Sequence, residues 1–306
     1  GRNRFADPND LALFRLADGN ALDGYIRRFE DAGLNKIVNS KGWQPDCALA
    51  DKIRFYARCA EHGLPHPRVF ATRERGRVTV LHAPGDTPLL VKPARGEGGR
   101  GVAFLRTPAT GDAAWAQAAV RGRRGAWLVQ ERVAPLEGLH DLALSALPTA
   151  RMTTIVNETG EPELVNAVLR MPSSPAAPID NMKAGGLLAP IDLESGTLGL
   201  ACAGYGGGDH VDHPVTGARI VGQALPDWSA ARALVVDAHA RAFCDYALVG
   251  WDVGFTPHGP VLIEGNGKPG VLMPQRAARC GLGAGRYGEF LAHHLYLLYI
   301  DNGLMF

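Results

Sequence analysis

The sequence predicts an α+β protein in which a short helical N-terminal segment precedes two lobes that each combine strands and helices. Three observations point to this class. Apolar residues recur at helical spacing near the N-terminus, short apolar runs typical of strands dominate the next block, and the rest of the chain mixes both patterns. We therefore expect a helical segment over residues 1–66, a small lobe over residues 67–133 and a large lobe over residues 134–306.

Each expected element has its own signal. Helices are expected over residues 23–32 and 51–62, each with an Asp at its N-cap and a Gly at its C-terminal end. In the small lobe, strand patterns start or extend over residues 69–71, 78–81, 89–92, 102–105 and 126–130, and a helix carries Trp115. In the large lobe we expect strands over 150–156 and 162–171, long Gly- and Pro-rich loops between 172 and 218, and helices over 229–246 and 287–299.

The composition argues against several classes of protein. The 306 residues are 46% hydrophobic and 21% charged, and a formal net charge of +1 gives no electrostatic case for nucleic acid or an anionic membrane as partner. No apolar run approaches the roughly 20 residues that span a bilayer, and the N-terminus carries no secretion-signal pattern. The five cysteines are scattered and form no Cys-x-x-Cys motif, which indicates reduced thiols and a cytoplasmic protein.

Two apolar segments near the C-terminus, residues 250–255 and 261–266, are separated by a short turn sequence and predict a β-hairpin. A hairpin centred on His258 would pair Phe255 with Val261 and Gly254 with Leu262.

The same register places two carboxylates together. Asp252 would lie opposite Glu264, with Cβ atoms roughly 5 Å apart, and Asn266 would share their face of the sheet. Like charges so placed repel unless a cation lies between them, and hard oxygen ligands favour Mg²⁺. The alternative is a different register, in which the two carboxylates are unrelated.

A glycine-rich loop follows a lysine-bearing strand. Lys92 ends the strand, and the loop carries Gly96, Gly98, Gly99 and Gly101. Glycines let backbone N–H groups approach a phosphate closely. A dinucleotide-binding loop would lead into a helix, whereas here a strand pattern follows. The arrangement favours a flap over a nucleotide triphosphate, with Lys92 on its phosphates; the alternative is a flexible surface hairpin.

Taken together, these motifs resemble the ATP-grasp superfamily, and the chain is most similar to the sugar-transfer associated ATP-grasp family. The matching segments are Asp51-Lys52, Val91-Lys92-Pro93, Asp180-Asn181, Ala184-Gly185-Gly186, Pro190-Ile191-Asp192, Ser195-Gly196, His213-Pro214, Thr216-Gly217, Pro226-Asp227-Trp228, Gly250-Trp251-Asp252 and Gly259 through Asn266. The resemblance implies an ATP-grasp fold, in which two α+β lobes clasp ATP.

The resemblance also implies roles for individual residues. Lys52 and Lys92 would contact the ATP phosphates, and Asp252, Glu264 and Asn266 would hold one or two Mg²⁺ ions. An interlobe hinge would read the adenine and ribose through Gln130, Glu131 and Val133. The implied reaction is activation of a small-molecule carboxylate as an acyl phosphate, which an amine then displaces, with ADP and phosphate as products.

All but one of the candidate residues for the chemistry and the acceptor lie between the glycine-rich loop and the hairpin; the exception, Lys268, follows the hairpin. Arg151 and Arg170 are on adjacent predicted strands, and Arg170 is favoured as a bridge between γ-phosphate and acceptor carboxylate, against the alternative of an arginine that emerges at a strand end. The predicted acceptor pocket contains Asp180, Asn181, Lys183, Gly185, Gly186 and Lys268, each of which could instead be a plain turn or solvated residue.

Two further points concern function. The segment from Asp209 to His213 superficially resembles a metal cluster, but its glycine- and proline-rich setting indicates a loop in which His213 hydrogen-bonds locally. The phosphate and metal apparatus would also serve a kinase that acts on a small hydroxyl metabolite, or a nucleotide-binding module without turnover. The sequence leaves these alternatives open.

Overall fold

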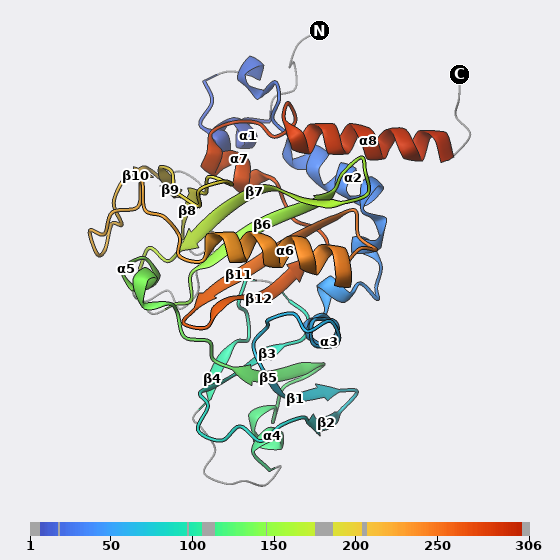
Figure 1. Cartoon of the computed structure of the whole chain (residues 1–306), viewed down its shortest axis with the longest axis vertical. Helices are drawn as coiled ribbons and strands as arrows, with labels where there is room; N and C mark the ends of the chain where they lie inside the picture. Colours follow the sequence, from blue (N-terminus) through green and yellow to red (C-terminus); the bar gives the residue numbers. More distant parts are fainter. Residues whose placement is uncertain are drawn as a thin grey trace.

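The computed structural model describes residues 7–17, 19–96, 98–105, 114–144, 146–174, 186–203 and 207–301. Within these residues the strands form two antiparallel sheets, one of five strands and one of seven. The five-stranded sheet lies at one end of the molecule, helices from both ends of the chain lie at the other, and the seven-stranded sheet lies between them (Figure 1). This combination of helices and antiparallel sheets is the α+β class that the sequence predicts.

The five-stranded sheet contains the strands expected between residues 69 and 131. Its order is β2 (Arg77–Val80), β1 (Val69–Glu74), β5 (Trp127–Glu131), β3 (Leu89–Pro93) and β4 (Ala103–Leu105). Helix α4 (Ala114–Ala119) packs against this sheet, and its buried Trp115 belongs to an apolar cluster with Phe70 and Val129. The sheet places Lys92 at the end of β3, next to the glycine-rich loop.

The seven-stranded sheet forms the centre of the molecule. Its order is β10 (Asp209–His210), β9 (Ala201–Ala203), β8 (Leu187–Pro190), β7 (Pro162–Met171), β6 (Thr149–Val156), β11 (Leu248–Thr256) and β12 (Gly259–Asn266). One face packs on α6 (Trp228–Ala242) through a core that includes Met152 and Trp251. Because side chains alternate along a strand, Arg151 and Asp252 lie on the opposite face.

Helices from both ends of the chain cover part of that opposite face. Residues of α2 (Arg28–Val38) and α8 (Arg286–Asp301) form an apolar cluster with Ile155 and Leu248. Helix α7 (Leu272–Ala278) contributes Ala277 to a second cluster with Val168 and Leu188. The described helices include none that is both long and apolar enough to cross a membrane.

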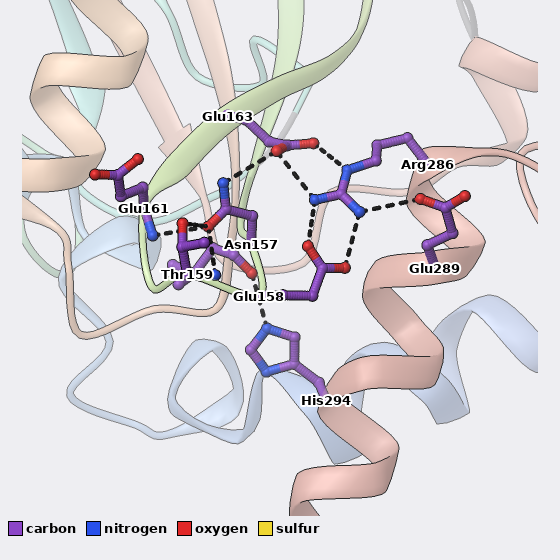
Figure 2. A network of polar contacts seen from close by, with 9 residues as sticks. Asn157, Glu158, Thr159, Glu161, Glu163, Arg286, Glu289 and His294 are labelled. Carbon is purple, nitrogen blue, oxygen red and sulfur yellow. Dashed lines mark hydrogen bonds and ion pairs between the residues drawn. The ribbon is translucent and has the colours of Figure 1, made fainter.

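Polar contacts join α8 to the turn between β6 and β7 (Figure 2). The first residue of α8, Arg286, binds Glu158 in that turn, Glu163 on β7 and Glu289 on its own helix. About two turns further along α8, His294 Nε2 lies 2.9 Å from the Val156 carbonyl oxygen. These contacts hold the C-terminal helix against the β6–β7 turn and the strand ends next to it.

The N-terminal segment is helical, as expected, although one helix is displaced. Its elements are α1 (Pro8–Phe14), η1 (Gly19–Leu22), α2, η2 (Ser40–Trp43), η3 (Ala48–Ala50) and α3 (Lys52–Glu61). The helix predicted over residues 23–32 is wrong, because α2 begins at Arg28 and continues through Gly33. Its start is set by Glu30, which accepts hydrogen bonds from Arg27 N at 2.8 Å and Arg27 Nε at 3.0 Å.

Helix α3 is confirmed with its predicted caps. Asp51 accepts hydrogen bonds from Ile53 N at 3.1 Å and Arg54 N at 3.4 Å, and Gly63 follows the helix with φ of +65°. The expectation of long loops between residues 172 and 218 is wrong in part, because the described portion contains β8, β9 and β10. After β5 the chain also forms η4 (Glu137–Leu139) and α5 (His140–Ala143).

Candidate functional site

The β11–β12 hairpin places Asp252 directly opposite Glu264, as predicted, but the pairing register between this pair and the turn differs from the predicted one. The predicted pairs of Phe255 with Val261 and Gly254 with Leu262 are wrong: Phe255 pairs with Pro260 and Gly254 with Val261. The turn has two residues, and Thr256 closes it by accepting from His258 N at 3.0 Å and donating to Gly259 O at 2.8 Å.

An extra residue on β12 restores the predicted carboxylate pair. The register shifts between Val253 and Asp252, so that Ile263 has no direct partner on β11. This is a β-bulge, which places two residues of one strand opposite one residue of the other. The bulge turns Glu264 onto the face that carries Asp252, and Asn266, paired with Gly250, lies on that face too.

Asp252 lies between two arginines from the neighbouring strands. Arg151 is its direct partner on β6, and two of its three guanidinium nitrogens donate to the carboxylate: Nε to Oδ1, and Nη2 to Oδ2 at 3.3 Å. Arg170 on β7 donates to Asp252 Oδ2 at 2.8 Å and to Thr149 Oγ1 at 2.6 and 3.0 Å. Burial opposes the charge of Asp252, but the two guanidinium groups outweigh it and lower its pKa to about 2.

Glu264 has its own basic partner, which comes from α3. Lys52 Nζ lies 3.0 Å from Glu264 Oε1 and donates to Gly96 O at 2.9 Å. The backbone N–H of Lys52 also donates to Ala94 O at 2.8 Å. The first residue of α3 therefore joins the end of β3 and the start of the glycine-rich loop to β12.

The second predicted phosphate lysine reaches the same strand through a tyrosine. Lys92 Nζ is 2.9 Å from the Tyr56 hydroxyl, which donates to Ile263 O at 2.6 Å. Burial, reinforced by the positive charge of Lys52, lowers the pKa of Lys92 to about 7. Tyr56 was missed by sequence reasoning; the available signal was its position four residues after Lys52, on the same face of α3.

The glycine-rich loop has the backbone conformations that its glycines permit. The φ angles of Gly96, Gly98, Gly99 and Gly101 are +130°, +67°, +68° and +80°. Side chains are disfavoured in this region of φ. A Cβ at residue 101 would also lie 3.0 Å from the Trp127 ring.

The predicted hinge residues lie at the C-terminal end of β5, the central strand of the small sheet: Gln130 and Glu131 are its last two residues, and Val133 follows it. Gln130 is buried, and its Nε2 donates to Glu131 O at 3.3 Å. The Glu131 N–H donates to Arg68 O at 2.9 Å, and Val133 is half-buried just after the strand. Further along, Leu136 N donates to Phe255 O at 3.0 Å on β11, so this connection runs directly from the small sheet to the β11–β12 hairpin.

The donor set on the hairpin suits Mg²⁺. Two carboxylates and an amide are the oxygen ligands that Mg²⁺ takes, with phosphate oxygens and water completing its shell. The described residues contain no group of three or more His, Cys, Asp or Glu side chains that could hold a metal ion, so the third protein ligand here would be the Asn266 amide. The expectation that the two carboxylates repel each other unless a cation lies between them is wrong, because Arg151, Arg170 and Lys52 already balance their charge without a metal.

The remaining predicted residues divide into three groups. Lys268 is exposed, with Nζ 4.1 Å from the centre of the Trp43 ring. Gly186 is buried just before β8, whereas Asp180, Asn181, Lys183 and Gly185 lie outside the described residues. His213 hydrogen-bonds as expected: its Nδ1 accepts from Val215 N at 3.4 Å and its Nε2 donates to Pro172 O at 2.8 Å.

Comparisons with known proteins identify the family. Among solved structures, the chain is similar to D-alanyl-alanine synthetase A from Vibrio cholerae O1 biovar eltor, with 15% identity, TM-score 0.49, and 83% of this chain and 66% of that chain covered. It is also similar to D-alanine–D-alanine ligase from Bacillus anthracis, with 12% identity, TM-score 0.46, and 85% of this chain and 70% of that chain covered. A third similar structure is L-amino acid ligase from Bacillus licheniformis, with 13% identity, TM-score 0.44, and 79% of this chain and 49% of that chain covered.

A search of curated proteins finds no match. The model of the sugar-transfer associated ATP-grasp family matches residues 36–285, which include both sheets and every described residue of the site. The chain therefore belongs to the sugar-transfer associated ATP-grasp family.

Proposed function

We propose that the protein is an ATP- and Mg²⁺-dependent ligase that activates a small-molecule carboxylate as an acyl phosphate for attack by an amine, releasing ADP and phosphate. One observation carries the proposal. Four basic side chains from α3 and both sheets surround two carboxylates. Arg151 and Arg170 pair with Asp252, and Lys52 pairs with Glu264. Lys92 is linked through Tyr56 to the backbone of Ile263, the residue before Glu264.

The charge balance of this cluster favours a polyanionic ligand. The positive side chains outnumber the negative ones, and a triphosphate would compensate the excess. Lys52 and Lys92 would bind phosphate oxygens as point charges, and the glycine-rich loop would add backbone N–H donors from above. The chain between the two sheets, with Gln130, Glu131 and Val133, would hold the nucleoside, so that lobes over residues 67–133 and 134–306 clasp the nucleotide.

Asp252, Glu264 and Asn266 would hold Mg²⁺, which supplies positive charge at the phosphate oxygens when it is bound. The two arginines would act on the reacting groups. The guanidinium fork matches a carboxylate or a phosphate and keeps its charge. Arg170, aligned by Thr149, would orient the acceptor carboxylate next to the γ-phosphate, and Arg151 would stabilise the charge of the transferring group.

The chemistry balances in two steps. A carboxylate oxygen of the acceptor attacks the γ-phosphorus, the bond to the β-phosphate oxygen breaks, and ADP leaves. An amine then attacks the carbonyl carbon of the acyl phosphate, loses a proton, and expels phosphate. Neither step requires a side-chain nucleophile, which agrees with a site built from cations and carboxylates. Acceptor contacts would come from Asp180, Asn181, Lys183, Gly185, Gly186 and Lys268.

The test is a turnover screen with pooled carboxylic acids and amines, in which ADP and phosphate are measured and adducts are detected by mass. The proposal predicts ADP formation that requires both a carboxylate and an amine, with an adduct that has lost water. A phosphorylated hydroxyl compound would indicate a kinase instead. Tight ATP binding without turnover across the screen would indicate a nucleotide-binding module.

A further inference from the structure

The Tyr56 hydroxyl connects two groups that the sequence places far apart. It lies 2.9 Å from Lys92 Nζ on β3 and 2.6 Å from the carbonyl oxygen of Ile263 on β12. A carbonyl only accepts hydrogen bonds, so the single hydroxyl proton must go to Ile263 O. The hydroxyl oxygen is then left to accept from the Lys92 ammonium, which fixes the direction of both hydrogen bonds.

Packing leaves the ring little freedom to turn. Tyr56 is 2% exposed, and its ring stacks on His66 with centroids 5.3 Å apart and an interplanar angle of 29°. Phe55 packs beside it at 5.4 Å. Burial raises the pKa of the Tyr56 hydroxyl well above its usual value, so the proton needed by Ile263 O stays in place.

The anchor point on β12 is the bulge. A bulge residue is left outside the regular ladder of hydrogen bonds, so its backbone needs another partner. Tyr56 supplies that partner for Ile263, while Lys52, one helical turn earlier on α3, binds the next residue, Glu264. Helix α3 thus sets both predicted phosphate lysines in relation to the same two residues of β12, Ile263 and Glu264.

We infer that Tyr56 is a positioning residue, which fixes the Lys92 ammonium against the bulge of β12 so that it faces the nucleotide phosphates. The inference rests on the proposed function, because it takes Lys92 to be a phosphate ligand. Lys92 would bind phosphate in the ground state and the transition state alike. Loss of its positioning should therefore appear mainly in KM for ATP rather than in kcat.

The direct test is Tyr56→Phe, which keeps the ring and removes the acceptor. KM for ATP should rise about tenfold, the size expected for a hydrogen bond to a charged group, while kcat changes less than about threefold. Tyr246→Phe is the matched control: Tyr246 is also buried, its hydroxyl accepts from Ala48 N at 3.0 Å, and Lys41 Nζ lies 5.8 Å from its ring centre. This control should leave KM within about twofold.

A double-mutant cycle separates positioning from general damage to the fold. In a Lys92→Met protein the Tyr56 hydroxyl has no ammonium to hold, so adding Tyr56→Phe should leave KM for ATP unchanged. Equal KM values for Tyr56→Phe and Tyr246→Phe, additive effects in the cycle, or a loss of kcat at unchanged KM would overturn the inference.

A readout without nucleotide keeps the two proposals distinguishable. The lysine ¹³Cε signal that disappears in Lys92→Met should move in Tyr56→Phe and stay in place in Tyr246→Phe. If the wild-type protein bound no ATP, the proposed function would fail, yet this signal would still report whether Tyr56 holds Lys92. An unmoved signal in Tyr56→Phe would overturn the contact itself.

Discussion

Asp252 lies directly opposite Glu264 because two one-residue shifts in the β11–β12 hairpin cancel each other. Relative to the register predicted from the sequence, the two-residue turn shifts each residue of β11 to a partner one position earlier on β12. The bulge at Ile263 then shifts the pairing by one residue in the opposite direction. The carboxylates consequently share a face that is lined by Arg151 and Arg170 on one side and by Lys52 on the other. The first two predictions concern this group.

Asp252→Asn should abolish Mg²⁺-dependent ATP turnover, with a loss of at least about 100-fold. The amide is uncharged, so it neither binds a metal as a carboxylate does nor balances two guanidinium groups. Phosphate release as a function of Mg²⁺ concentration measures the effect. The matched control is Asp245→Asn, because Asp245 is likewise paired with two basic side chains, Lys41 and Arg58. A control that loses as much turnover as Asp252→Asn would contradict a specific role for Asp252.

Arg170→Lys should lower kcat by about 100-fold and change KM for ATP by less than about threefold. Lysine keeps the charge but lacks the planar fork with which Arg170 binds Thr149 and Asp252 together. Steady-state kinetics with a saturating acceptor measures both constants. Arg279→Lys serves as control, because Arg279 also donates to several oxygens, those of Leu200, Ala277 and Asp209, but lies outside the candidate site. Unchanged kcat in Arg170→Lys would argue that this arginine is structural.

The glycine-rich loop should affect ATP binding and should itself become better ordered when ATP binds. Gly98→Val puts a β-branched side chain at φ of +67° and in the way of a phosphate, so it should weaken ATP binding by about tenfold or more. Gly122→Val tests the backbone cost alone, because Gly122 has φ of +71° and open space around it. Hydrogen exchange over residues 94–102 should slow in the wild-type protein when Mg-ATP binds. Equal exchange with and without saturating nucleotide would show that the loop is no phosphate lid.

The free energy of unfolding should decrease as the pH falls, because His239 is buried in its neutral form. This side chain is fully buried, accepting at Nδ1 from the Thr154 hydroxyl at 2.7 Å and donating from Nε2 to Tyr246 O at 2.8 Å. Burial lowers its pKa to about 4. The folded pKa is depressed, so its contribution of about 3 kcal/mol is complete above the unfolded value near 6.5 and is lost as the pH falls toward 4.

Chemical denaturation between pH 7 and pH 4 measures that effect. His239→Gln preserves one donor and one acceptor but cannot take up the proton, so the pH dependence of its unfolding free energy should be shallower. The exposed His258 at the hairpin turn provides the control, and His258→Gln should retain the wild-type slope. Parallel slopes for wild type and His239→Gln would mean that other groups govern acid unfolding.

Sequence patterns were sufficient where a local rule decides the structure. The five strands of the small sheet, the caps of α3 at Asp51 and Gly63, and the ten-residue strand β7 follow from alternation, capping and turn chemistry. They failed where tertiary packing decides. Strands β8 to β10 are two to four residues long, too short for a periodic signal, and they form by successive pairing, β8 on β7, β9 on β8 and β10 on β9.

The candidate site follows the same division. The opposition of Asp252 and Glu264 was predicted, although from a register that is wrong at the turn, because a bulge leaves no clear mark in sequence. The pairing of Asp252 with Arg151 and Arg170 joins residues 101 and 82 positions apart, which only the strand order β7-β6-β11 brings together. The contact of Tyr56 with Lys92 likewise depends on the placement of α3 between the sheets.

The transfer of phosphate to a carboxylate is the central claim, and isotope transfer tests it most directly. A carboxylate acceptor found in the turnover screen would be labelled with ¹⁸O in both carboxyl oxygens and incubated with ATP, Mg²⁺ and the amine. Mass analysis of the products should give ADP together with phosphate that carries one ¹⁸O atom, because the oxygen that attacked phosphorus leaves with it. Unlabelled phosphate, or AMP with pyrophosphate, would contradict activation of the carboxylate as an acyl phosphate.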